Sequence, residues 1–230
     1  MKTIRDTGRP DLLRRGTVAA LAAACAAIAA TDVLNPQYSP VSEVVSRYVN
    51  GSVGWLVTLA LLAIGAASAA LTARLGRLSG PSTGRTAARR TGRAALAVWA
   101  VGVLVAAAFP ADPPGRWSRP SVSEMVHGAA AWPAFVALPV AALLLTGSLA
   151  ARWPVGRTAL FAATAASVLT TVALAVCLVD VMDGPSLGLG SAPTLVGLVE
   201  RLAIAADLAW LALAATATAP RVRDDRNVHA

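Results

Sequence analysis

This chain is poor in the residues on which soluble and metal-dependent proteins rely. Charged residues make up 14% of its 230 residues, whereas about 25% is usual in soluble domains. The chain has two histidines. His127 lies in an apolar segment and His229 in the C-terminal tail. A transmembrane haem usually takes a pair of axial ligands, and a catalytic zinc takes about three protein ligands. We therefore predict no metal and no cofactor.

Several signatures of common chemistry are also missing. The sequence contains no Gly-rich phosphate loop, no nucleophile elbow and no Cys-x-x-Cys pair, so the usual motifs of nucleotide, hydrolase and thiol chemistry are absent. The two cysteines, Cys25 and Cys177, fall at different depths of their apolar segments, about 10 Å apart at about 1.5 Å per residue. A disulfide requires Cα atoms within about 7 Å, so two free thiols are expected.

Long apolar segments dominate what is present, and 56% of the residues are hydrophobic. The segments cover roughly 16–34, 53–73, 94–109, 124–149, 156–180 and 195–219. A bilayer core is crossed by about 20 apolar residues in a helix, and the third segment reaches that length only from Gly92 to Phe109. We predict an all-α fold, a polytopic transmembrane bundle of six helices over residues 16–219, with basic tails at 1–15 and 220–230. The first segment resembles a signal peptide, but because five more spans follow it we expect it to be retained.

Basic residues are distributed unevenly around these segments. Sixteen lie in the two tails and in the second and fourth connections, and one, Arg201, lies inside the last segment. The other connections hold only Arg47, Arg116 and Arg119. Basic residues are retained on the cytoplasmic side, so both termini are predicted to be cytoplasmic in a multi-pass protein of the plasma membrane. The chain has a net charge of +8, and its basic residues flank the apolar segments. This pattern indicates membrane lipids and not nucleic acid as partners.

Acidic residues gather at the opposite ends of the segments, in the outer loops and outer helix ends. On a helix, Glu200 and Asp207 share a face, and so do Glu124 and His127. Ionisable groups within a span are costly without partners or a wet cavity. We predict a polar pocket open to the outside. Its candidate residues are Asp32, Glu43, Arg47, Asp112, Glu124, His127, Asp180, Glu200, Arg201 and Asp207.

The pocket residues admit two interpretations. The functional one is a ligand site, a proton relay or a catalytic acid and base. The structural one is an ion-pair network in which Arg201 bonds to Asp180, Asp32 or Glu124. In the first outer connection, Ser42 is expected to cap a short helix from Glu43 to Tyr48, with Tyr48 at the level of the lipid headgroups.

Four features occur in a characteristic order. They are Pro-x-Tyr-Ser-Pro-Val-Ser-Glu-x-Val-Ser at 36–46, Phe109-Pro110-Ala111-Asp112, His127 at the start of the fourth segment, and Gly197-Leu198-Val199-Glu200-Arg201 followed by Trp210. In these features, over roughly residues 15–219, the chain resembles the DUF998 family of bacterial and archaeal membrane proteins. The resemblance implies the membrane fold and no particular activity. More distantly, the layout is similar to Frag1/DRAM/Sfk1-type six-helix proteins, which implies lipid-related roles.

These features favour a noncatalytic role, the binding or passage of a lipid or small amphiphile through the pocket. One alternative is a membrane-embedded enzyme that uses Glu124, His127, Glu200 and Asp207 on a lipid-borne substrate. Another is an accessory subunit of a membrane complex. The sequence leaves the ligand, the direction of transport and the oligomeric state open.

Overall fold

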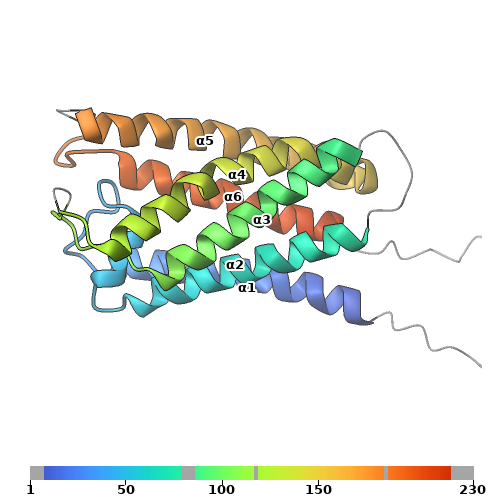
Figure 1. Ribbon diagram of the computed structural model, residues 1–230, viewed down its shortest axis with the longest axis horizontal. Helices are drawn as coiled ribbons and strands as arrows, with labels where there is room; N and C mark the ends of the chain where they lie inside the picture. The colour runs from blue at the N-terminus through green and yellow to red at the C-terminus, as the bar shows by residue number, and fades with distance from the viewer. Residues whose placement is uncertain (1–7, 79–85, 117–118, 184–185, 219–230) are drawn as a thin grey trace, which may run out of the picture.

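The protein is a bundle of long α-helices (Figure 1). The computed structural model describes residues 8–78, 86–116, 119–183 and 186–218. In this part of the chain the helices are α1 (Gly8–Leu34), α2 (Trp55–Arg77), α3 (Thr86–Ala108), α4 (Val122–Arg152), α5 (Arg157–Asp183) and α6 (Val196–Ala217), with short 3-10 helices η1 (Val45–Asn50) and η2 (Pro154–Gly156). No strand occurs within those ranges apart from an isolated bridge between Leu189 and Ala192. The predicted all-α class is confirmed.

Five of the described helices are long and apolar enough to cross a membrane. The candidate spans are Arg14–Leu34, Trp55–Arg77, Ala87–Ala108, Val122–Arg152 and Pro154–Val181, the last of which includes η2 and most of α5. The sixth, α6, has 22 residues but carries Glu200, Arg201 and Asp207. Its charged side chains therefore need partners inside the protein if it also spans.

Some predicted boundaries differ from the structure. Helix α3 begins at Thr86, well before residue 94, because its first turns hold arginines, which are good helix formers. Helix α1 begins at Gly8, inside the predicted N-terminal tail. Residues 1–7 and the predicted C-terminal tail 220–230 lie outside the described residues. The predicted helix from Glu43 to Tyr48 is wrong in register, since η1 starts at Val45 and the Ser42 hydroxyl donates to Thr194 O at 3.1 Å.

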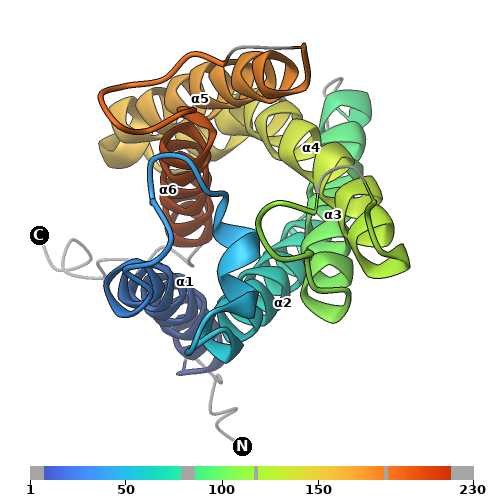
Figure 2. The same cartoon turned by 90° about the vertical axis from the view of Figure 1, so that its left-hand side faces the viewer.

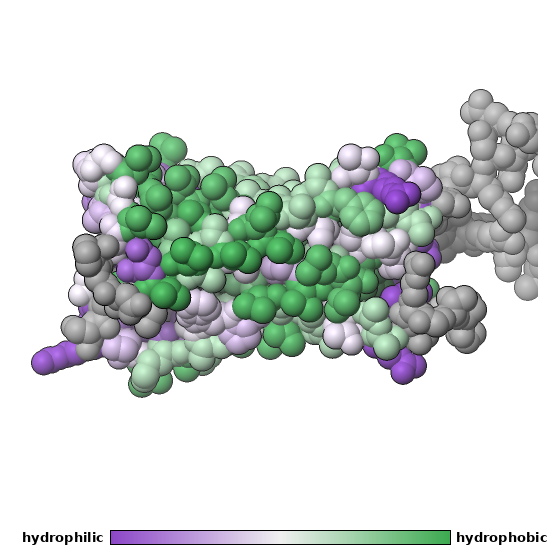
Figure 3. Space-filling view, turned by 90° about the horizontal axis from the view of Figure 1, so that it is seen from above, coloured by the Kyte–Doolittle hydropathy of each residue, from purple (hydrophilic) through white to green (hydrophobic). Residues whose placement is uncertain are grey.

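Viewed along their axes, the six α-helices form a ring (Figure 2). Each helix packs against the next in sequence, and α6 closes the ring against α1. The connections 35–54, 109–121 and 186–195 lie at one end, here called the loop end, and the described chain begins and ends at the other. The face that carries α5 is hydrophobic along its middle and hydrophilic at both ends (Figure 3), as expected for a surface in contact with lipid.

Buried side-chain hydrogen bonds join the helices. Trp99 Nε1 donates to Ser68 Oγ at 3.0 Å between α3 and α2. Trp210 Nε1 donates to Thr146 Oγ1 at 2.9 Å, and Thr146 bonds Thr164 Oγ1 at 2.7 Å, which links α6, α4 and α5. Lipid tails are as apolar as the helix surfaces, so packing and such bonds, more than a hydrophobic difference, hold membrane helices together. These bonds thus connect α2 to α3, and α4 to both α5 and α6, around the centre of the bundle.

Candidate functional site

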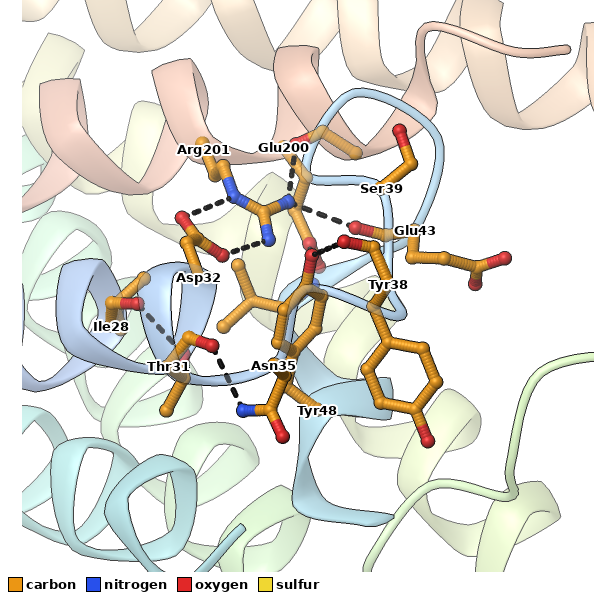
Figure 4. Close-up of polar contacts among 12 residues, drawn as sticks. Ile28, Thr31, Asp32, Asn35, Tyr38, Ser39, Glu43, Tyr48, Glu200 and Arg201 are labelled. Atoms are coloured by element: carbon orange, nitrogen blue, oxygen red, sulfur yellow. Dashed lines mark hydrogen bonds and ion pairs between the residues drawn. The ribbon is translucent and has the colours of Figure 1, made fainter. Parts of the chain in front are cut away.

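The positive charge of Arg201 on α6 is paired with a carboxylate on α1, at the other end of the sequence. Arg201 bonds the carboxylate of Asp32 on α1 at two points, Nη2–Oδ1 at 2.5 Å and Nε–Oδ2 at 3.0 Å. Its Nη1 donates to the carbonyls of Glu43 and Gly197 at 2.8 and 3.0 Å, and the guanidinium lies 5.0 Å from the centre of the Tyr48 ring. We call these groups the Arg201 latch (Figure 4). Asp32 is one of the three partners expected for Arg201.

The segment before η1 docks on the first turns of α6. The N–H of Leu198, which has no partner within its own helix, donates to Val41 O at 3.0 Å. Glu200 Oε2 accepts the N–H of Val45 at 2.5 Å and so anchors the start of η1. The contact is close, because a Cβ on Gly197 would lie 2.4 Å from Glu43 O. The two sequence motifs at 36–46 and 197–201 are therefore one structural unit.

Tyr48 belongs to this unit and not to the lipid interface. Its side chain is fully buried, and its hydroxyl donates to Tyr38 O at 3.3 Å. Burial raises the pKa of Tyr48 to about 12, against the opposing effect of the nearby Arg201 cation. The Tyr48 ring is therefore not exposed to lipid headgroups, because it packs under the guanidinium of Arg201.

A second unit locks the connection between α3 and α4. Ser121 caps α4 by accepting the N–H of Glu124 at 3.1 Å. In a capping box Glu124 would bond the N–H of Ser121 in return. Here Asp112 Oδ2 accepts that N–H at 2.7 Å, and Glu124 Oε2 accepts the N–H of Asp112 at 2.7 Å. We call these three residues the Asp112 clasp. The bonds from Ser121, more than the nearby Arg116, hold the pKa of Asp112 below its usual value.

His127 completes the end of α3. Pro110 has no N–H to donate to Ala106 O, four residues earlier. His127 Nδ1 lies 3.1 Å from that oxygen and 2.8 Å from Phe109 O. Both partners are acceptors, so Nδ1 carries a proton.

A cavity of about 220 Å³ lies between the two units, and all six α-helices contribute to its wall. Its charged and ionisable lining residues are Arg47, Glu124, His127 and Glu200. The rest of the wall is largely apolar and includes Trp99, Val103, Phe135, Leu174 and Ile204. The cavity is therefore amphipathic, with polar groups contributed by η1 and the loop-end turns of α4 and α6.

Arg47 contributes a positive charge to the wall of the cavity. It is 2% exposed. Burial lowers the pKa of its guanidinium, while the carboxylates of Glu43, Glu124, Asp112 and Glu200 act in the opposite direction. Arginine stays charged at neutral pH, so a buried cation faces the carboxylates from both units.

Other candidate residues lie away from the cavity lining. Glu43 contributes its backbone carbonyl to the latch, and its carboxylate points away from Arg201 (Figure 4). Asp180 Oδ2 accepts the N–H of Leu187 at 2.7 Å and so joins α5 to the segment 186–195. Asp207 is fully buried against α5, where Oδ1 accepts the hydroxyl of Ser167 at 2.6 Å. Of the four residues of the enzyme alternative, Glu124, His127 and Glu200 line the cavity, and Asp207 does not.

The predicted site did not include the apolar residues of the cavity wall, because it was based on charged residues. Trp99, Phe135 and Leu174 look like ordinary span residues in the sequence. The available signal was the small residues Gly128 and Ala131, which leave room on the cavity face of α4. Among the described residues no group of three or more histidines, cysteines, aspartates or glutamates is placed to hold a metal.

Residues 18–217 match the family described as "Protein of unknown function (DUF998)". This match covers most of the chain, so the protein belongs to the DUF998 family. No curated protein and no solved structure matches the chain.

Proposed function

We propose that this DUF998 protein is a six-span plasma-membrane protein that binds a lipid or small amphiphile in its central cavity. In this proposal α6 is the sixth span, both termini are cytoplasmic, and the loop end faces outward. The uneven distribution of basic residues supports the orientation. The Arg201 latch supports spanning by α6, because the ion pair with Asp32 removes the cost of an isolated guanidinium in the membrane.

The observation that carries the binding role is the amphipathic lining of the cavity. Small-molecule sites are mostly apolar with a few polar groups that fix orientation. An apolar cavity of about 150 Å³ is large enough to bind benzene, so a volume of about 220 Å³ holds part of a hydrocarbon chain. The polar head of the ligand would lie beside Arg47, Glu124, His127 and Glu200.

Binding fits the geometry better than catalysis does. Glu200 and Glu124 each accept a backbone N–H, and His127 Nδ1 serves the end of α3. These bonds hold the chain in place and leave only part of each side chain for a ligand. The fourth residue of the enzyme alternative, Asp207, is bonded to Ser167 instead.

Native mass spectrometry of protein extracted from membranes tests this proposal. Wild-type protein is expected to carry a bound lipid or amphiphile. Gly128 lines the cavity, and a Cβ there would meet nothing within 4 Å. Gly128→Leu therefore fills the cavity without a backbone clash. A leucine side chain in the space that the ligand would use is expected to weaken ligand binding about tenfold, or about 1.4 kcal/mol.

The matched control is Gly147→Leu on the same helix. A Cβ at Gly147 also meets nothing within 4 Å, but this glycine is exposed. The control should retain the bound mass. Equal loss in both variants, or no bound mass in the wild type, would refute the proposed function.

A further inference from the structure

Two residues of α4 belong both to the cavity wall and to the surface of the bundle. Trp132 and Val136 line the cavity, and they are 46% and 55% exposed. A side chain can do both only where the wall is one residue thick or open. The cavity therefore reaches the side of the protein at this point.

The opening lies on the side of α4 that faces α5. Residues of α5 from Thr171 to Leu178 line the same cavity, including Leu174 and Ala175. The hydrogen bond between Thr146 and Thr164 ties α4 to α5 near the end opposite the loops. From there towards the loop end the two helices diverge (Figures 1 and 2).

The loop end is more heavily covered than this side. The lining includes the whole segment from Val44 to Arg47, and that segment is anchored by the Arg201 latch and by the bond from Val45 to Glu200. Asn50 Nδ2 further joins η1 to the α3–α4 connection through Ala111 O at 3.0 Å. Passage through this end would require these bonds to break.

A surface groove continues from the lateral opening along the outside of α4. It is almost entirely apolar and lies over α3 and α4, with Val98 of α3 and Trp132, Val136 and Val140 of α4 in its lining. Trp132 and Val136 are common to the groove and the cavity. Pro133, in the same groove, removes one backbone hydrogen bond from α4, which makes bending there easier. A hydrocarbon chain lying in this groove would contact Trp132 and Val136, the two residues that also line the cavity.

We propose that the cavity is filled sideways from the bilayer, between α4 and α5, by a hydrocarbon chain of a membrane lipid. This inference rests on the proposed function and narrows its ligand to a lipid with a long acyl chain. The lateral opening is bounded by Trp132, Val136, Ala175 and Leu178. The lipid head stays near the loop end while the chain enters through the opening.

Lipid exchange separates this inference from the binding role itself. Protein in nanodiscs of palmitoyl-oleoyl phosphatidylglycerol is mixed with vesicles of the chain-deuterated lipid, and native mass spectrometry follows the mass of the bound lipid with time. Val136→Trp, at the exposed rim, should slow exchange about tenfold. Trp132→Ala should accelerate exchange. Poor folding would also accelerate exchange, so the slowing expected for Val136→Trp is the change that it would not mimic.

The matched control is Leu143→Trp, at a position on α4 that is 61% exposed and outside the cavity lining. It should exchange at the wild-type rate. Wild-type rates in both rim variants, with lipid bound, would overturn the lateral route and leave the binding role intact. Absence of bound lipid from the wild-type protein would contradict both the lateral route and the binding role.

Discussion

The guanidinium of Arg201 on α6 and the carboxylate of Asp32 on α1 form a two-point ion pair across 169 positions of sequence. Both side chains are largely buried, with 14% and 22% of their surfaces exposed. The pair joins the last helix to the first and closes the ring. The same guanidinium holds the carbonyl of Glu43 in the segment that covers the cavity.

Removing this cation should destabilise the fold. Arg201→Leu leaves the Asp32 carboxylate without its partner, and breaking a buried pair costs about 3 kcal/mol. Arg119→Leu, in the exposed α3–α4 connection, is the control and should have little effect. Thermal unfolding in detergent measures the stability of both variants. Equal unfolding midpoints would mean that the ion pair of Arg201 does not stabilise the fold.

Glu200 should matter through the hydrogen bond that it accepts. Glu200→Gln keeps a side-chain oxygen for the N–H of Val45, whereas Glu200→Ala leaves that N–H buried without a partner, which costs about 1–3 kcal/mol. Alanine is therefore expected to lower the unfolding midpoint clearly more than glutamine. Hydrogen exchange at Val45 gives a local check, since only the alanine variant should lose protection there. Unchanged protection in Glu200→Ala would contradict the anchoring role.

The sequence predicts the helices better than it predicts how their polar residues combine. Apolar length predicts the long helices, five of which could cross a membrane, because the thickness of the bilayer sets that length. The partner of Arg201 could not be chosen among Asp32, Asp180 and Glu124, since helix rotation and neighbours are set by packing. Likewise, helix geometry places Glu200 and Asp207 on one face of α6, as predicted. Their partners differ, because Glu200 bonds to η1 and Asp207 bonds to Ser167 on α5.

Asp207 is expected to have a structural role. Asp207→Asn keeps an oxygen that can accept the Ser167 hydroxyl, so folding and bound lipid should match the wild type. Asp207→Leu loses the bond and should cost about 0.6 kcal/mol, the average for such bonds between membrane helices. Native mass spectrometry and unfolding midpoints test both variants. A well-folded Asp207→Asn protein that has lost a growth phenotype supported by the gene would instead indicate proton-coupled function.

The Asp112 clasp should weaken in acid. The pKa of Asp112 is lowered in the folded protein by the bonds from Ser121. Its contribution is therefore fully present above the unfolded value of about 3.9 and is lost as the pH falls through the lower folded value. Pepsin cleavage of the 109–121 connection, normalised to an unstructured peptide, should rise below about pH 4. In Asp112→Asn cleavage should already be raised at higher pH and should change less with acid, and identical profiles would argue against the clasp.

The proposed topology predicts the accessibility of two connections. In a background lacking Cys25 and Cys177, a cysteine at Ser186 should react with an impermeant reagent in intact cells. A cysteine at Ser82, which lies outside the described residues, should react only after the membrane is opened. Equal reactivity at both sites would contradict the six-span arrangement.

The most direct test of the central claim is to locate a lipid chain inside the protein. Phospholipids with brominated acyl chains can be incorporated into nanodiscs with the wild-type protein, and bromine can be located in an electron cryomicroscopy map. We expect bromine density in the cavity among Trp99, Phe135 and Leu174, and weaker density there in Gly128→Leu. Bromine confined to the surrounding bilayer, with the cavity empty or filled by water, would contradict the account.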